Sequence, residues 1–309
     1  MADITKALVT GGSGFIGSNL ARELVSQGVE VVVVDTVATG FNRCPHGVRH
    51  LAIDIRDTAA LSDACNGVSH LFHLAALPRV QDSLESPIST HEVNVTGTLS
   101  VLEAARHAGV KRVVFSSSAA VYGEQETMPL IETMAADPKS PYGLHKWMGE
   151  VMGNAWHTIY GLEVVSLRYF NVYGPFFDPQ GSYPLVVGKF IDWHTQNHPL
   201  LIAGDGTNTR DYVHVYDVVR ANIKAAISGL VGKGESINIG TGIETSVNEI
   251  AEIIGGERQY GPKRLEPTRS CASITKADEL IDWTPTVSIE KGISDLVGWY
   301  RDNQPLYQK

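Results

Sequence analysis

A glycine-rich turn near the start of the chain limits the possible folds more than any other feature of the sequence. Gly11 and Gly14 lie between the apolar run 7–9 and the segment 15–28, whose apolar residues recur with helical spacing, and Gly17 lies near the start of that segment. Glycines at a strand-to-helix turn let the backbone approach a pyrophosphate, whose charge meets the N–H groups that open the helix. Although the spacing departs from the commoner Gly-x-Gly-x-x-Gly, the turn predicts a dinucleotide-binding unit.

An acidic residue after the second predicted strand, 31–34, strengthens this prediction. Asp35 follows Gly17 by 18 residues, where a carboxylate accepts hydrogen bonds from the adenosine ribose hydroxyls. The same charge would repel a 2′-phosphate, and no Lys or Arg lies within 36–42. The sequence therefore favours NAD over NADP. Asp54-Ile55 ends the third predicted strand, where it either meets the adenine or, through Asp54, caps the next turn.

Strand-like apolar runs alternate with helical patterns over the first half of the chain, which predicts parallel strands joined by crossover helices. We expect an α/β fold in which a Rossmann-type doubly wound parallel sheet occupies residues 1–170. A smaller α/β, substrate-binding portion is expected over residues 171–309, and the chain is expected to cross between the two more than once. The predicted strands are 7–9, 31–34, 50–53, 70–74, 112–115 and 164–168, and the predicted long helices are 15–28, 88–107 and 142–160.

Composition and charge exclude several classes of protein. The net charge of -9 and the lack of a dense Lys/Arg block argue against nucleic-acid binding. No apolar run reaches membrane-spanning length, and the N-terminus lacks a signal-peptide pattern. Cys44, Cys65 and Cys271 show neither paired nor metal-like spacing, so we expect no metal site and a reducing, cytoplasmic location.

A tyrosine and a lysine four residues apart provide the candidate chemistry. Tyr142 and Lys146 share one face of the predicted helix 142–160. An ammonium in that position stabilises a phenolate and pulls a tyrosine pKa of about 10 toward neutrality. The triplet Ser116-Ser117-Ser118 follows a predicted strand and would supply a hydroxyl. The same spacing is typical of many solvated helix faces, and it becomes informative only beside the glycine turn.

Taken together, these motifs resemble the extended short-chain dehydrogenase/reductase family, in particular its nucleotide-sugar 4-epimerases. The resemblance covers nearly the whole chain. Its further motifs are His73-Leu74-Ala75-Ala76, Asn94-Val95-Thr96-Gly97-Thr98, 116–123, 168–175, Gly204-Asp205-Gly206, 210–215 and Asn238-Ile239-Gly240.

The resemblance implies a role for each motif residue. Tyr142 is expected to act as the base, Lys146 to hold the nicotinamide ribose and Ser118 to hydrogen-bond the reacting hydroxyl. Residues expected to contact the NAD cofactor are Gly11, Gly14, Phe15, Ile16, Gly17, Asp35, Asp54, Ile55, Leu74, Ala75, Ala76, Asn94, Ser116, Tyr142 and Lys146. Those expected to contact a UDP-sugar are Ser117, Ser118, Tyr142, Asn171, Arg210 and Arg269, with Arg264 as the alternative to Arg269. In the family, helices corresponding to 88–107 and 142–160 form a homodimer interface, and His73 is expected to brace its strand.

Two departures from the patterns of related enzymes reduce the number of reactions that we expect. Ala119-Ala120 stands where 4,6-dehydratases carry an Asp-Glu pair, and Phe176-Phe177 where uronate enzymes usually carry an arginine. We therefore expect NAD-dependent inversion of carbon 4 of a UDP-hexose through a transient 4-keto sugar. Ser270 and Cys271 are small, which leaves UDP-glucose and UDP-N-acetylglucosamine both open. The alternatives are a UDP-glucuronate 4-epimerase, a 4,6-dehydratase, a nucleotide-sugar dehydrogenase or reductase, and a non-catalytic NAD-binding protein.

Overall fold

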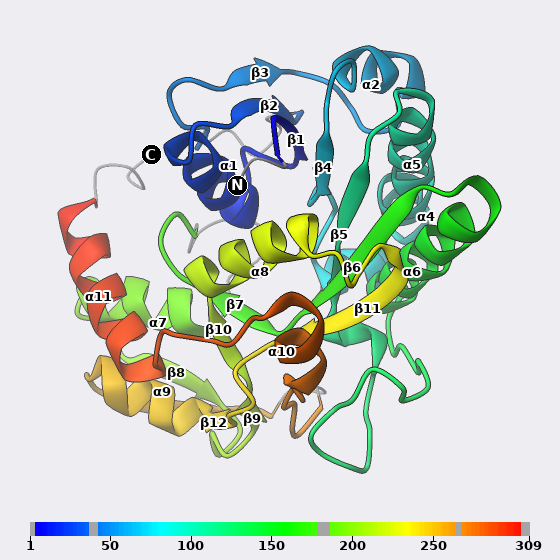
Figure 1. Ribbon diagram of the computed structural model, residues 1–309. Coiled ribbons are helices and arrows are strands. Elements are labelled where there is room, and N and C mark those ends of the chain that lie inside the picture. The colour runs from blue at the N-terminus through cyan, green and yellow to red at the C-terminus, as the bar shows by residue number, and fades with distance from the viewer. Residues whose placement is uncertain (1–3, 37–42, 178–185, 264–266, 304–309) are drawn as a thin grey trace.

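A seven-stranded parallel sheet forms the centre of the molecule (Figure 1). The computed structural model describes residues 4–36, 43–177, 186–263 and 267–303. In spatial order the strands are β11 (Lys233–Ile239), β6 (Glu163–Tyr169), β5 (Arg112–Ser118), β4 (His70–His73), β1 (Lys6–Thr10), β2 (Glu30–Val34) and β3 (Arg49–Leu51). The chain order runs outward in both directions from the β1–β4 pair. This confirms the predicted doubly wound sheet, whose ligand-binding crevice lies at the carboxyl ends of the strands near that switch point.

Helices cover both faces of the sheet, as Figure 1 shows. The helices α1 (Phe15–Ser26) and α8 (Val215–Ile227) bury one face, while α2 (Thr58–Ala64), α5 (Gly97–His107) and α6 (Pro141–Tyr160) bury the other. Each face of the sheet packs into its own apolar core. Val31 and Val33 of β2 belong to the core that contains α1, and Val32 and Val34 belong to the core that contains α5. Burial on both faces explains why the strands read as continuous apolar runs.

A third apolar core lies in the C-terminal part of the chain. It packs α7 (Val186–Thr195), α9 (Val247–Ile254) and α11 (Ile289–Asp302) around β8 (Leu200–Ala203) and its parallel partner β13 (Arg258–Gly261). Other elements include two short strand pairs, β7 (Asn171–Tyr173) with β10 (Tyr212–His214) and β9 (Thr209–Arg210) with β12 (Thr245–Ser246), and helix α10 (Thr275–Ile281). Because α8 and β11 return to the central sheet, the chain crosses between the two parts, and the division at residue 170 stays a prediction.

Several predicted elements differ in detail from the observed ones. The serine triplet lies inside β5, which continues to Ser118, rather than after it. The predicted helix 88–107 consists of α4 (Pro87–His91), a π-helical segment (Glu92–Thr96) and α5. Two helices were not predicted from the sequence, namely α2, which Asp57 caps by accepting the N–H of Ala60, and α3 (Val80–Glu85).

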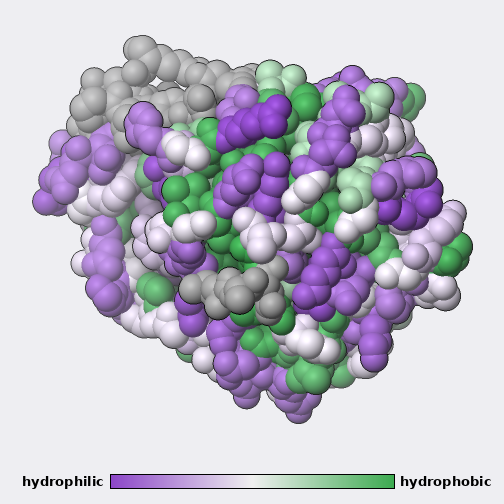
Figure 2. Space-filling model, turned by 45° about the horizontal axis from the view of Figure 1, so that its top comes forward, coloured by the Kyte–Doolittle hydropathy of each residue, from purple (hydrophilic) through white to green (hydrophobic). Residues whose placement is uncertain are grey.

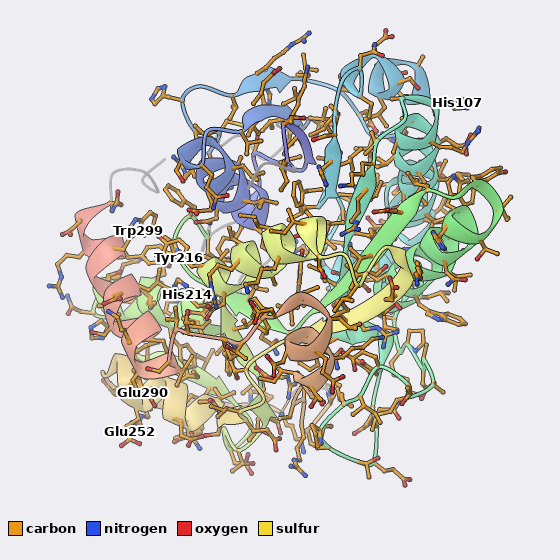
Figure 3. All side chains as sticks on the ribbon, viewed as in Figure 1. His107, His214, Tyr216, Glu252, Glu290 and Trp299 are labelled. Atoms are coloured by element: carbon orange, nitrogen blue, oxygen red, sulfur yellow. The ribbon has the colours of Figure 1, made fainter. Side chains whose placement is uncertain are left out.

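Aromatic contacts join α8 to the strand pair β7–β10. The Nδ1 atom of His214 accepts the N–H of Tyr216 at 3.2 Å, and their rings are 4.8 Å apart, as the labelled side chains illustrate (Figure 3). The His214 ring also meets the Tyr173 ring edge-on at 5.2 Å. These contacts orient the chain as it leaves β10 and enters α8.

The surface seen in Figure 2 mixes hydrophilic and hydrophobic side chains. Across the described ranges, no helix is long and apolar enough to cross a membrane. Nor do the described residues bring three or more His, Cys, Asp or Glu side chains together as a metal-binding group. The cytoplasmic location inferred from the sequence stays a prediction.

Candidate active site

The glycine turn between β1 and α1 is too crowded for side chains. Gly11 has a φ of +70°, and a Cβ on it would lie 2.7 Å from the backbone nitrogen of Ala75. A Cβ on Gly17 would lie 2.2 Å from the carbonyl oxygen of Gly11. Helix α1 begins after Gly14, and no side chain caps it. A bare helix N-terminus beside a close backbone cradle fits a pyrophosphate, and contact of these glycines with one stays a prediction.

Asp35 is held against this turn by a backbone hydrogen bond. Its Oδ2 atom accepts the N–H of Ser13 at 3.0 Å. The Ser13 hydroxyl in turn lies 3.1 Å from the Cys44 thiol and 3.3 Å from Nε2 of His50. These contacts place the carboxylate beside the predicted pyrophosphate site, at the end of β2, where a ribose would lie.

The segment after β4 forms a second wall, which buried polar groups brace. His73 is buried between the hydroxyls of Thr10 (2.8 Å) and Thr98 (3.0 Å). Burial, and to a lesser degree the Lys146 charge, lower the pKa of His73 to about 3, so the imidazole is neutral. Asn94 accepts the N–H of Leu77 at 2.8 Å and donates to its carbonyl at 3.0 Å. Leu74, Ala75 and Ala76 lie on the chain between these two braces.

Asp54 and Ile55 have contacts of their own within the protein. Asp54 accepts the backbone N–H of Arg56 at 2.9 Å and its guanidinium at 2.6 Å, and these bonds hold the pKa of Asp54 below its ordinary value. The Ile55 side chain is buried, and it occupies the space that a Cβ on Gly97 would need. Contact of either residue with an adenine stays a prediction.

The three serines of β5 point to different partners. The carbonyl of Ser116 accepts Nζ of Lys146 at 2.6 Å. Ser117 is buried and donates to Oε1 of Glu150 at 2.5 Å, so its contact with a substrate stays a prediction. Ser118, at the end of the strand, is less buried and its hydroxyl accepts the N–H of Ala120 at 3.2 Å.

Tyr142 and Lys146 lie near the start of α6, as the sequence predicted. Ser140 caps the helix by accepting the N–H of Gly143 at 3.1 Å, and Pro141 occupies its first turn. The Lys146 nitrogen lies 5.9 Å from the centre of the Tyr142 ring. The two groups therefore share one side of the helix, next to the end of β5.

Burial controls the charge of Lys146. The side chain is 4% exposed, and its nitrogen also lies 5.0 Å from the centre of the Phe115 ring. Burial lowers the pKa of Lys146 to about 7, and the nearby Glu150 carboxylate raises it in part. A buried cation next to a phenol stabilises the phenolate form, so the arrangement can move a proton at the tyrosine oxygen.

Of the predicted substrate arginines, Arg210 lies in the short strand pair β9–β12, and Arg269 follows Thr268, whose carbonyl accepts the N–H of Thr209 in β9. Arg210 is in β9, and its register partner is Thr245. Arg269 is exposed and donates to both oxygens of Glu244, at 3.0 and 2.5 Å. Glu244 also accepts the hydroxyl of Thr209 at 2.6 Å, which connects the two arginines. The alternative, Arg264, lies outside the described residues.

Asn171 begins β7, and its side-chain nitrogen donates to the carbonyl of Asp211 at 3.2 Å. Asp211 is buried and also accepts the N–H groups of Thr241, Gly242 and Ala272. These bonds hold together the segments that carry Asn171, Arg210 and the small residues near position 271.

Two carboxylates in this region, Glu150 and Glu244, were not predicted from the sequence. Glu150 lies one helical turn beyond Lys146 on the same face of α6, and its spacing was the available signal. No local sequence pattern indicated Glu244, because it contacts Arg269 only when the folded chain brings the two segments together.

Comparisons with known proteins agree with this geometry. A family model described as the NAD dependent epimerase/dehydratase family matches residues 7–240. A relative named putative UDP-glucose 4-epimerase, from Methanocaldococcus jannaschii, is 40% identical, with 96% of this chain and 98% of the relative covered. Among solved structures, the UDP-glucose 4-epimerase of Thermotoga maritima is 37% identical with a TM-score of 0.92, covering 97% of this chain and 99% of that one.

Other relatives and solved structures are named for different UDP-sugars. The solved UDP-N-acetylglucosamine 4-epimerase of Methanobrevibacter ruminantium M1 is 32% identical with a TM-score of 0.92, covering 97% of this chain and 99% of that one. Further relatives are named for UDP-glucuronate, and further solved structures contain NAD.

Proposed function

The chain belongs to the NAD-dependent epimerase/dehydratase family, and from that premise we propose that it inverts carbon 4 of a UDP-hexose. Like its relatives it is an isomerase of the UDP-sugar 4-epimerase group, with NAD as its cofactor. The observation that carries the proposed reaction is the placement of Tyr142 and buried Lys146 on one side of α6, beside the end of β5.

The proposed mechanism assigns proton transfer to Tyr142. Its phenolate, stabilised by the Lys146 ammonium, takes the proton of the 4-hydroxyl and later returns it. Ser118 hydrogen-bonds the same oxygen from the end of β5. The bound NAD supplies reversible hydride acceptance at carbon 4, and the net redox change over a turnover is zero. The glycine turn and Asp35 hold the pyrophosphate and the ribose in this scheme.

We assign the diphosphate of the substrate to the β9–β12 side. Arg210 and Arg269 present guanidinium groups whose planar fork suits phosphate oxygens. Glu244 orients the Arg269 fork and lies within reach of Thr209. Asn171, which is held by Asp211, contacts the sugar or the diphosphate in this assignment.

A neutral hexose fits the proposed site better than a uronate. After Pro175 the chain carries Phe176, whose ring stacks on the Arg22 guanidinium at 4.2 Å and meets the Trp299 ring at 5.0 Å. The Phe176 ring itself offers no charge partner for a sugar carboxylate, and the Arg22 guanidinium is stacked on that ring. Cys271 is small and buried, so we propose room for either a 2-hydroxyl or a 2-acetamido group.

Activity on a panel of sugars tests the proposal. Purified protein is incubated with UDP-glucose, UDP-N-acetylglucosamine, UDP-glucuronate and UDP-xylose, and the anomeric protons are followed by NMR. We expect 4-epimers of the first two sugars, with no net absorbance change at 340 nm. Absence of a 4-epimer from every sugar would refute the proposal, and a 340-nm change stoichiometric with turnover would indicate a redox enzyme.

We further propose that the protein pairs with a second copy through α6 and the helices before it. Exposed apolar side chains gather there, namely Leu84, Ile88, Leu99, Leu144, Trp147, Val151 and Ile159. Leu144, Trp147 and Val151 have the i, i+3, i+7 spacing of one helix face, and Ile88 and Leu144 line a cavity of about 850 Å³. Light scattering should give a dimer mass, and a monomer mass for Val151→Arg. A monomeric wild-type protein would refute the pairing.

A further inference from the structure

A buried ion pair lies one helical turn beyond Lys146. Glu150 of α6 is 5% exposed and Arg168 of β6 is 6% exposed. The Arg168 guanidinium donates Nε to Oε1 at 2.8 Å and Nη2 to Oε2 at 2.6 Å. The hydroxyls of Ser117 and Ser236 add bonds of 2.5 and 2.9 Å. The carboxylate therefore has a partner on each of its four lone-pair positions, which determines its orientation.

This pair connects the proton-transfer helix to three strands. Glu150 follows Tyr142 and Lys146 on one face of α6, at intervals of one helical turn. Arg168 is the register partner of Ser117 in β5, and Ser236 belongs to β11. The strand that ends in Ser118 and the helix that carries Lys146 are thus attached to the same carboxylate.

We propose that Glu150 and Arg168 are positioning residues for the proton-transfer group, with the Glu150 carboxylate keeping the buried Lys146 ammonium charged and the Arg168 guanidinium limiting that effect. The pair touches neither cofactor nor substrate in this assignment. The consequence for catalysis rests on the proposed function, whereas the effect on Lys146 can be measured without it.

The charges around Lys146 give the direction of each effect. Tyr142 and Glu150 face it from α6, His73 from β4 and the Ser116 carbonyl from β5, while Arg168 reaches it through Glu150 from β6. His73 is neutral, so Glu150 supplies the negative charge among these described groups while Tyr142 is protonated. Removing the carboxylate lowers the pKa of Lys146 further, because burial is then opposed less and Arg168 loses its counter-charge. Removing the guanidinium raises the pKa of Lys146.

The direct test follows the Lys146 ammonium by NMR. Protein labelled with ¹³C-lysine is titrated with pH, and the Cε resonance missing from a Lys146→Met variant is assigned to Lys146. We expect the midpoint to move down in Glu150→Gln and up in Arg168→Met. Opposite shifts distinguish an electrostatic role from loss of structure, which would move both variants in one direction or neither.

A matched control lies at the other end of the same two strands. Arg112 of β5 donates Nε to Glu163 of β6 at 2.8 Å, and the two are register partners. Glu163→Gln removes a carboxylate that also pairs with a buried arginine, but it is more exposed than Glu150 and lies away from the serine triplet. It should leave the Lys146 midpoint unchanged.

Activity gives the second readout. The Lys146 ammonium is lost as pH rises through its pKa, so Glu150→Gln should move the alkaline limb of kcat to lower pH. We expect a fall in kcat of about tenfold at pH 8, which corresponds to a pKa lower by about one. The KM for the UDP-sugar should stay within about twofold, because Arg210 and Arg269 are not attached to this pair.

Each outcome decides the proposal. Folded variants with unchanged midpoints, or midpoints that move in the same direction, would overturn it. If neither single variant folds, Glu150→Gln/Arg168→Met avoids a net buried charge; its midpoint should lie below the wild-type value, and an equal midpoint would overturn the proposal. A wild-type protein that epimerises no sugar would refute the proposed function while the titration still decides the role of Glu150.

Discussion

The two sides of the candidate site are built differently. On the α6–β5 side, Lys146, Glu150 and Arg168 are buried and hydrogen-bonded, so their charges act on one another through a medium of low polarity. On the β9–β12 side, Arg269 is exposed and Glu244 is partly exposed, where water and salt weaken each charge. The comparison suggests that the first side sets protonation states and the second holds an exchangeable ligand.

The largest expected effect is on the buried side. Tyr142→Phe removes the proposed base, so we expect kcat to fall by about 10³-fold, within the range for loss of acid–base catalysis. Substrate binding should change little, because the ring remains. Steady-state kinetics measures the fall, and the thermal unfolding temperature controls for folding. A kcat within tenfold of the wild-type value would remove Tyr142 from its proposed role.

The second-largest effect is expected at the glycine turn between β1 and α1, where the cofactor is proposed to bind. Gly17→Ala places a methyl group 2.2 Å from a backbone oxygen, so we expect the NAD content of purified protein and its NAD affinity to fall at least about tenfold. The control is Gly298→Ala in α11, where a Cβ meets nothing within 4 Å. This variant should keep full NAD content, and equal losses in both would contradict the cradle.

A smaller effect is expected on the exposed side. Arg269→Met should raise the Kd for a UDP-sugar about tenfold, because one charge-assisted contact is lost. The thermal unfolding temperature should stay unchanged, because an exposed ion pair contributes little to stability. Added salt should weaken wild-type binding more than binding by the variant. Arg106→Met, which breaks a partly exposed pair with Glu103 on α5, is the control. An unchanged Kd in Arg269→Met would show that Arg269 does not bind the diphosphate of the substrate.

The smallest effect concerns stability against pH. Burial lowers the pKa of His73 to about 3, whereas an unfolded histidine titrates near 6.5. Between these values the unfolded chain binds the extra proton, so His73 makes the protein lose stability as pH falls from about 6.5 toward 3. In His73→Asn this loss should be shallower by up to about 1.4 kcal/mol per pH unit, as urea unfolding at pH 7 and pH 5 would measure. An unchanged slope would exclude the burial effect.

Local patterns predicted the features that depend on neighbouring residues. The glycine turn, the strand and helix on either side of it, and the shared face of Tyr142 and Lys146 each follow from backbone geometry over a few residues. For the same reason the continuous apolar runs indicated strands covered on both faces. The role of the Ser117 hydroxyl could not be predicted from its neighbours in the sequence. Ser117 contacts Glu150 only when α6 packs on β5.

Sequence patterns were enough to predict the glycine turn and the tyrosine–lysine face, because each depends on conformational preferences within one segment, and the alternation of strands and helices predicted the doubly wound sheet. The pairing of Glu150 with Arg168, the link from Thr209 through Glu244 to Arg269, and the return of β11 to the central sheet became visible in the folded molecule. Such contacts form between segments far apart in the chain. Burial and charge compensation select them, and neither is expressed in the pattern of a single segment.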